Sequence, residues 1–343
     1  MKALNLVAYN QFECGDAPDP EPGPGEVVIA VKACGICGSD IHGMDGSSGR
    51  RIPPIIMGHE ASGVIASLGT EVTNWQTGDR VTFDSMVHCG QCQSCKNGKS
   101  NLCSNRRVLG VSCEEYRQQG AFAELLKLPA HLLHKLPENL SFEQGAFAEP
   151  VSIALHAVNR VPAGPGKSAV VVGVGMIGIL VVQALRMRGC DPVYAIDLDP
   201  KKLQLACSLG AQEGFLASEA DPVAMIRQRN LPDGVDIAME AVGIAPSVAT
   251  AIQCVKKGGA VGLIGNLAAE IPFALQAVVT REISLLGSCA CAGEYPEALK
   301  CIADGNIQVE PLLSKVAPLS EGAHWFEKLY KAEGNLMKVV LVP

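Results

Sequence analysis

Four cysteines stand close together between residues 89 and 103, in the pattern C-x2-C-x2-C-x7-C. The two-residue spacing lets successive sulfur atoms turn inward from one tight loop. A fourth cysteine can complete a tetrahedron, which is the geometry that zinc takes in structural sites. Four protein ligands leave no open coordination position, so this metal would stabilise the fold and take no part in chemistry. The predicted ligands are Cys89, Cys92, Cys95 and Cys103.

An iron–sulfur cluster is the main alternative for this cysteine set, because such clusters also use four thiolates. The spacing differs from the common ferredoxin runs, however, and no proline follows Cys103. Four buried cysteines without any metal are the other alternative. The pattern favours zinc over both.

A second set of metal-binding side chains is dispersed along the first half of the chain. Cys37 lies in ACGICGSDIH, and His59 and Glu60 lie in GHEASG. Glu149 lies in FAEPVSIALH. Taken singly, such residues are most often structural or solvated, but together they offer one thiolate, one imidazole and two carboxylates, all of which zinc accepts. A catalytic zinc needs only three protein ligands and an open position for water or substrate, and this set allows that.

A glycine-rich turn, G-V-G-M-I-G, follows the apolar run SAVVV and precedes a helical pattern. Glycines in this context allow a tight turn and the close approach of a pyrophosphate to a helix N-terminus. An acidic residue, Asp197, ends the next strand-like run; it would accept hydrogen bonds from the ribose hydroxyls and repel a 2′-phosphate, which favours NAD over NADP. Lys202 either contacts the ribose edge or faces water. The predicted cofactor-binding residues are Gly173, Gly175, Met176, Ile177, Gly178, Asp197 and Lys202.

The elements that must position these residues differ between two parts of the chain. Residues 1 to about 150 show short β-branched runs between Pro/Gly turns, such as EVVIAVKACGI after PEPGPG, which predicts an irregular β-rich domain. From about Val151, strand-like runs alternate with helical stretches, as in AVVVGVG, MIGILVVQALRMRG and PVYAIDLD. This βαβ rhythm is typical of a doubly wound parallel sheet, so the expected fold class is α/β. The tail LMKVVLVP has the pattern of a strand.

Composition indicates a chain with a substantial core. Its 343 residues suffice for about two domains, and 48% are hydrophobic against 18% charged. The formal net charge is −7 without a long basic run, so we expect neither a nucleic acid nor a membrane as partner. No membrane-spanning segment or secretory signal is predicted. Fourteen cysteines without an export signal suit metal binding in a reducing compartment, so we expect a cytoplasmic protein.

The motifs CGICGSD, GHEASGV, the four-cysteine set and G-x-G-x-x-G occur in this order over essentially the full length. In this combination the chain resembles the zinc-containing medium-chain dehydrogenase/reductase family. The resemblance implies a GroES-like catalytic domain, residues 1–152 with 287–343, and a Rossmann NAD-binding domain, residues 153–286. It also implies two zinc ions per chain, one catalytic and one structural, NAD as cofactor, and a homo-oligomer that is a dimer or a tetramer.

The same resemblance implies the ligands of the catalytic zinc. Cys37 and His59 match two of the family's zinc ligands. The third ligand is either Glu60 or Glu149, with one bound directly and the other bound through water or in exchange with it. Ethanol-type members carry cysteine where this chain has Glu149, and polyol-type members carry glutamate.

A proton path is also implied by the resemblance. Ser39 would pass the substrate proton outward and His42 would complete the relay, because the hydride and the hydroxyl proton must leave separately. A solvated turn is the alternative for both residues. Asp40 is interpreted as a structural partner of this loop.

The substrate branch is indicated by EPVSIALHAV, which resembles polyol and butanediol dehydrogenases more than threonine dehydrogenases, since the latter usually carry aspartate at His156. The expected activity is hydride transfer from a secondary alcohol of a polyol, polyol phosphate or vicinal diol to NAD, giving a ketone. A 2,3-butanediol- or L-threonine-type dehydrogenase is the alternative. The loop after Cys103 carries Glu114, Glu115 and Arg117, which would meet hydroxyls or a phosphate, or face water; the sequence leaves this open.

Two hypotheses from other functional classes compete with this one. A zinc-independent quinone reductase of the same superfamily conflicts with the joint presence of Cys37, His59 and the cysteine set. A non-enzymatic NAD-binding protein would be expected to have lost a zinc ligand or Ser39, and neither is lost.

Overall fold

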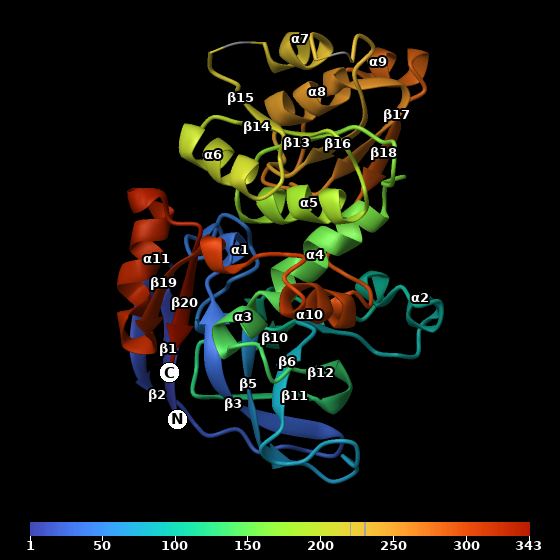
Figure 1. The fold of residues 1–343 in the computed structure, drawn as a ribbon. Coiled ribbons are helices and arrows are strands. Elements are labelled where there is room, and N and C mark those ends of the chain that lie inside the picture. Colours follow the sequence, from blue (N-terminus) through green and yellow to red (C-terminus); the bar gives the residue numbers. More distant parts are fainter. Residues whose placement is uncertain (220, 230) are drawn as a thin grey trace. The chain divides into compact units, whose positions relative to one another are not determined.

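The computed structural model describes residues 1–219, 221–229 and 231–343 (Figure 1). The chain divides into two compact units. The first consists of Met1–Glu149, Tyr295–Gly305 and Val309–Pro343, and the second of Pro150–Glu294 and Asn306–Gln308. The change of unit therefore falls inside helix α4 (Ala148–Asn159).

The first unit is built around a seven-stranded sheet with the order β12-β6-β5-β3-β20-β19, in which β11 also pairs with β3. Its strands are β3 (Glu26–Gly35), β5 (Glu60–Leu68), β6 (Arg80–Phe83), β11 (Leu125–Pro129), β12 (Leu133–Lys135), β19 (Leu313–Pro318) and β20 (Lys338–Val342). The predicted C-terminal strand is thus confirmed, and it pairs antiparallel with β3 at the centre of the sheet. The remaining strands of this unit are β1 (Lys2–Ala8), β2 (Gln11–Asp16), β4 (Ile55–Ile56), β7 (Met86–Val87), β8 (Arg107–Val108), β9 (Val111–Ser112) and β10 (Arg117–Gln118).

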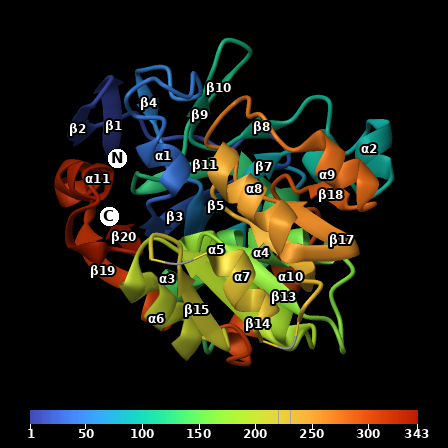
Figure 2. The ribbon, with the colours of Figure 1, turned by 90° about the horizontal axis from the view of Figure 1, so that it is seen from above.

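Short helices and one apolar core complete the first unit. Its helices are α1 (Gly38–Ile41), α2 (Gln93–Lys96), α3 (Phe142–Ala146), α10 (Tyr295–Ala303) and α11 (Gly322–Tyr330). In Figures 1 and 2 the C-terminal elements α11, β19 and β20 lie beside the N-terminal strands β1 and β2. The core joins distant segments, since Ile29, Phe122 and Phe326 are all 0% exposed and belong to one cluster. Burying this surface holds the two ends of the chain in one unit.

The second unit contains a six-stranded sheet with the order β15-β14-β13-β16-β17-β18, and every neighbouring pair is parallel. The strands are β13 (Ala169–Val172), β14 (Val193–Asp197), β15 (Glu213–Leu216), β16 (Val235–Glu240), β17 (Val255–Leu263) and β18 (Ser284–Gly287). Helices α5 and α6 cover one face and α7 and α8 the other (Figure 1). The helices are α5 (Met176–Met187), α6 (Pro200–Ser208), α7 (Pro222–Arg227), α8 (Ala245–Cys254) and α9 (Leu275–Thr280). The predicted doubly wound sheet is confirmed.

Local chemistry explains where the helices of this unit begin. Helix α6 follows Asp199, whose carboxylate accepts the backbone N–H of Lys201 at 2.9 Å, and Pro200 occupies its first turn. Helix α7 starts in the same way after Asp221. These caps satisfy N–H groups that have no partner within a helix. Across the described ranges, no helix has the length and apolar character that a transmembrane span requires.

Candidate active site and metal centres

Cys37, His59 and Glu60 come together in the first unit, with one potential ligand atom of each within 4.8 Å of the others. Strand pairing brings them together, because Gly35 at the end of β3 is paired with Glu60 at the start of β5. The Glu60 carboxylate needs the space left by that glycine, since a Cβ on Gly35 would lie 2.5 Å from Glu60 Oε2. His59 and Glu60 are buried and Cys37 is half-buried. The donor set of one thiolate, one imidazole and one carboxylate fits zinc.

A buried lysine from the C-terminal tail faces this set. Lys338 opens β20, and its Nζ donates to Glu60 Oε2 at 2.5 Å and to the Ile36 carbonyl at 3.1 Å. Burial disfavours the charged form of Lys338, but the negative charges of Glu60 and Cys37 outweigh burial and raise its pKa. Lys338 was not among the residues predicted from the sequence. Its one signal was a lysine inside an apolar strand-like tail.

Asp40 is fully buried and connects several parts of the Cys37 loop. Its Oδ2 accepts the backbone N–H of Cys37 at 3.3 Å, and its Oδ1 accepts from Arg51 Nη2 at 2.9 Å. Oδ1 also lies 3.5 Å from His59 Nδ1, which is ion-pair distance without hydrogen-bond geometry. Burial disfavours the charged forms of both Asp40 and His59. The positive charges of His59 and Arg51 nevertheless lower the pKa of Asp40. The negative charges of Asp40 and Cys37 likewise raise the pKa of His59. Asp40 therefore lies where an outer carboxylate commonly orients a metal-binding histidine.

Glu149 lies at the start of α4, beside this set but outside it. Within the described residues, the group whose ligand atoms all approach within 4.8 Å contains Glu60 and not Glu149. The Ser85 hydroxyl donates to Glu149 Oε1 at 3.4 Å, and both side chains are buried. Burial raises the pKa of Glu149 to about 7, with His59 opposing the rise and the Glu60 carboxylate adding to it. The arrangement puts a buried polar pair next to the three clustered donors.

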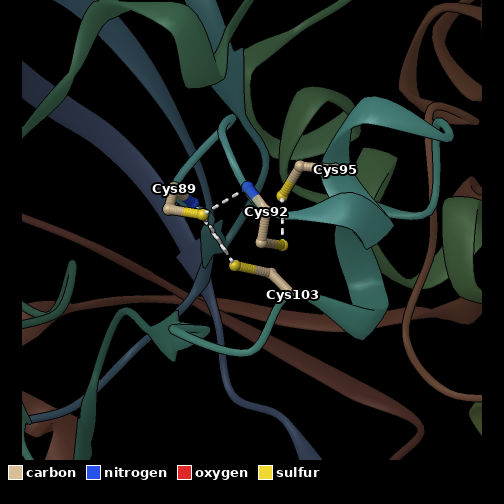
Figure 3. A group of neighbouring side chains, drawn as sticks. All are labelled: Cys89, Cys92, Cys95 and Cys103. Atoms are coloured by element: carbon tan, nitrogen blue, oxygen red, sulfur yellow. Dashed lines mark hydrogen bonds between the residues drawn. The ribbon is translucent and has the colours of Figure 1, made fainter.

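The four cysteines of the other predicted site turn their sulfur atoms toward one another (Figure 3). They come from the loop that carries α2, which lies at the margin of the first unit in Figures 1 and 2. The sulfur atoms are 3.5 Å apart in the pair Cys92–Cys95 and 3.5 Å apart in the pair Cys89–Cys103. Backbone N–H groups of Cys95 and Ser104 lower the pKa of the Cys92 thiol to about 5, which favours the thiolate that binds metal. All four sulfurs therefore fit one closed metal site.

The glycine-rich turn lies between β13 and α5 in the second unit. Gly173 has a φ of 86°, a left-handed conformation that favours glycine. A Cβ on Gly178 would lie 1.9 Å from the Gly173 carbonyl oxygen, so only glycine allows this close packing. Gly175 caps α5 and has open space where a Cβ would stand, while Met176 and Ile177 are half-buried in the first turn. The turn thus presents a helix N-terminus to an approaching anion.

Asp197 ends β14 and reaches across to this turn. Its Oδ2 accepts the backbone N–H of Val174 at 2.8 Å. Its Oδ1 accepts the N–H groups of Leu198 at 2.8 Å and Asp199 at 3.0 Å. Lys202 is half-buried in the first turns of α6. The acidic side chain therefore stands at the carboxyl edge of the parallel sheet, the edge at which such folds bind their ligands.

Comparison with known proteins identifies the chain. Family models match residues 23–138, as the alcohol dehydrogenase GroES-like domain, and residues 176–304, as zinc-binding dehydrogenase. The chain is 33% identical over 338 residues to the probable D-xylulose reductase A of Aspergillus clavatus, covering 96% of this chain and 93% of that protein. It is 30% identical to the sorbitol dehydrogenase of Bacillus subtilis, covering 100% and 97%. The solved 2R,3R-butanediol dehydrogenase of Bacillus subtilis matches with a TM-score of 0.89 at 31% identity, covering 100% and 99%.

The chain belongs to the zinc-containing medium-chain dehydrogenase/reductase family. The expected fold class, a GroES-like domain with a Rossmann domain, is confirmed by the two family models and the matching structure. This dehydrogenase is an oxidoreductase that uses zinc and NAD(P).

The structure places the other predicted residues of the dehydrogenase in different surroundings. Ser39 and His42 are both exposed on the short segment around α1. The Ser39 hydroxyl oxygen accepts a hydrogen bond from Arg51 Nη2 at 3.3 Å, a contact that was not predicted from the sequence. The loop residues Glu114, Glu115 and Arg117 are exposed. Arg51 precedes the pair Pro53–Pro54, but no sequence pattern distinguished it from the other arginines of the chain.

Proposed function

We propose that this dehydrogenase oxidises a secondary alcohol of a polyol, polyol phosphate or vicinal diol to a ketone, with NAD as the hydride acceptor. The observation that carries the proposal is the polar character of the candidate site. Glu149 and Ser85, buried and hydrogen-bonded to each other, stand beside the three clustered donors Cys37, His59 and Glu60. Buried polar groups favour a substrate with neighbouring hydroxyls over one with a purely apolar chain, because an apolar chain would leave them without partners.

The proposed catalytic zinc is held by Cys37, His59 and Glu60, whose ligand atoms lie within 4.8 Å of one another. Glu149 lies beside them, and it either binds the catalytic zinc through a water molecule or exchanges with Glu60 as a zinc ligand. The proposed structural zinc is held by the closed set Cys89, Cys92, Cys95 and Cys103.

Ser39 and His42 move the proton in this proposal. Zinc held by Cys37, His59 and Glu60 would supply Lewis-acid activation of the substrate hydroxyl, and NAD bound at the glycine turn would supply the hydride acceptor. Ser39 Oγ accepts the hydroxyl proton while passing its own to His42, whose exposed ring releases a proton to water. The balance is one alcohol and one NAD⁺ giving one ketone, one NADH and one proton.

The cofactor site is proposed at the carboxyl edge of the parallel sheet. Gly173, Gly175 and Gly178, with Met176 and Ile177 in the first turn of α5, form the pyrophosphate turn. Asp197 would accept hydrogen bonds from the ribose hydroxyls of the cofactor and would repel a 2′-phosphate, and Lys202 would contact the ribose edge.

We also propose a homo-oligomeric, cytoplasmic enzyme. Strand β18 is the edge of the parallel sheet, and the adjacent segment exposes Leu275 at 61% and Val279 at 65%, which favours burial against a second copy. The fourteen cysteines, all of which lie in the described residues, form no disulfide bonds, which suits metal binding and the reducing conditions of the cytoplasm.

A substrate panel tests the proposed function. NADH formation is followed with sorbitol, xylitol, galactitol 1-phosphate, 2,3-butanediol, L-threonine, ethanol and benzyl alcohol, each with NAD and with NADP. Polyols, their phosphates or vicinal diols should give the highest kcat/KM. The alternative, suggested by the likeness to a butanediol dehydrogenase, is supported if 2,3-butanediol alone turns over. High activity with ethanol or benzyl alcohol, and none with any polyol or diol, would contradict the proposal.

A further inference from the structure

Arg51 is a buried arginine that neither of the metal sets includes. Its side chain is 4% exposed and makes four hydrogen bonds. Nε and Nη2 donate to Asp40 Oδ1 at 3.2 and 2.9 Å, and Nη1 donates to the Arg50 carbonyl at 3.0 Å. Nη2 also donates to Ser39 Oγ at 3.3 Å. Gly43 leaves the space that this side chain occupies, because a Cβ on Gly43 would lie 2.5 Å from Arg51 Cγ.

The contact with Ser39 restricts what that hydroxyl can do. A guanidinium has only donors, so Ser39 Oγ acts as the acceptor in this contact. The hydroxyl keeps one free lone pair, to accept one proton, and its own O–H, to donate another. These are the two functions that a relay needs. Asp40 binds the same guanidinium and also accepts the backbone N–H of Cys37. These bonds therefore fix the position of Ser39 Oγ relative to Cys37.

We propose that Arg51 is a positioning residue of the proton relay at Ser39, an inference that rests on the proposed function. Ser39 Oγ receives the substrate's hydroxyl proton and its own O–H bond breaks toward His42. Arg51 gains and loses no proton. Its positive charge lies next to the oxygen through which the proton passes, and its fork prevents the hydroxyl from turning both lone pairs toward water.

Lysine is the informative replacement at this position. Arg51→Lys keeps the charge that compensates buried Asp40, so the fold should survive. It removes Nε and Nη1, which hold the guanidinium against Asp40 and the Arg50 carbonyl while Nη2 reaches Ser39, and one ammonium group cannot reproduce that geometry.

A double-mutant cycle with Ser39→Ala tests the proposal. The measured quantity is the pre-steady-state rate of NADH formation with the best alcohol of the panel. Arg51→Lys should slow this rate by about tenfold in the wild-type background, part of the roughly 100-fold that a relay contributes. In the Ser39→Ala background the same change should slow it less than about twofold, because the group through which Arg51 acts is gone. Equal factors in both backgrounds would overturn the proposal.

Two measurements separate positioning from mere support of the fold or the metal. Zinc content and the rate of zinc release to pyridine-2,6-dicarboxylate should match the wild type in Arg51→Lys. Faster release would mean that Arg51 acts on the metal ligands and would overturn the proposal. Arg80→Lys is the matched control. Arg80 donates to the carbonyls of Pro137 and Glu138 at 3.2 and 3.0 Å, so its loss should lower the unfolding temperature without slowing NADH formation.

Failure of the proposed function is distinguishable from failure of this inference. If the wild type oxidises some alcohol other than a polyol or diol, the substrate proposal fails, but the cycle can be run with that alcohol because every alcohol must lose the same proton. The Arg51 proposal fails only if Arg51→Lys slows NADH formation by the same factor in both backgrounds, or if it speeds the release of zinc.

Discussion

Lys338 Nζ donates to Glu60 Oε2 at 2.5 Å, although the two residues stand 278 positions apart. The two side chains are 4% and 2% exposed, so each charge depends on the other for compensation. The pairing of β20 with β3 and of β3 with β5 creates this contact beside the candidate catalytic zinc site. The C-terminal tail is therefore part of the site's electrostatics.

Lys338→Met should destabilise the protein by about 3–5 kcal/mol, because it leaves the Glu60 carboxylate buried without a cation. The loss should be larger in zinc-depleted protein, where no metal charge compensates Glu60. Urea unfolding with and without zinc measures both values. The control is Lys331→Met, which breaks a solvent-exposed pair with Glu327 and should lower the free energy of unfolding far less than Lys338→Met. Similar small losses for both variants would contradict the role given to the buried pair.

The two metal sites should differ in lability, with two zinc ions per chain in the active protein. Mild chelation should remove the catalytic zinc first and abolish turnover while the fold persists, because that site has fewer protein ligands than the closed cysteine set. Cys37→Ser should abolish activity in a folded protein. Cys95→Ser should lower solubility and unfolding temperature instead. Elemental analysis that finds at most one zinc ion in fully active protein would refute this prediction.

NAD should be preferred over NADP because Asp197 brings a carboxylate to the place of a 2′-phosphate. Asp197→Ala should weaken NAD binding and narrow the preference, and it should also loosen the glycine turn, since the carboxylate holds the Val174 N–H at 2.8 Å. Fluorescence titration with both cofactors gives the two dissociation constants. Asp233→Ala removes an exposed carboxylate of the same unit and should change neither constant. A wild-type protein that uses NAD and NADP equally well would show that Asp197 does not select between the two cofactors.

Sites formed by neighbouring residues in the sequence could be predicted, because short spacing limits the geometry. The cysteine set lies within one loop, and its sulfurs cluster as the pattern indicated. The strand, turn and helix around Gly173 were predicted in the same way, since tight turns dictate their own residue types. The parallel sheet followed from the alternation of strand-like and helical runs.

Contacts that depend on strand pairing could not be predicted from the sequence. Both Glu60 and Glu149 were candidates for the third ligand, and only the register of β3 against β5 brings Glu60 to Cys37. Lys338 and Arg51 were missed for the same reason, because each compensates a buried carboxylate whose burial no local pattern reveals. A single sequence shows which charged side chains exist but not which of them become buried in the fold.

We expect the stability of the first unit to depend on pH through His134. Its ring stacks on Tyr295 with centroids 4.9 Å apart and planes at 4°, and burial lowers the pKa of His134 to about 4. In the unfolded chain a histidine titrates near pH 6.5. Between about pH 6.5 and pH 4 the unfolded chain therefore binds more protons than the folded one. Stability is fully present above that window and falls as the pH decreases through it.

Replacing the ring should remove this pH dependence. His134→Phe keeps a flat ring against Tyr295 but cannot be protonated, so the free energy of unfolding of the wild type should fall relative to the variant by about 2 kcal/mol between pH 7.5 and pH 5. Urea unfolding at several pH values measures the difference, and other titrating groups cancel because both proteins share them. The same replacement at exposed His324 controls for the effect of introducing a phenyl ring in the same unit. A constant difference between wild type and His134→Phe across this range would show that His134 is protonated as readily in the folded protein as in the unfolded chain.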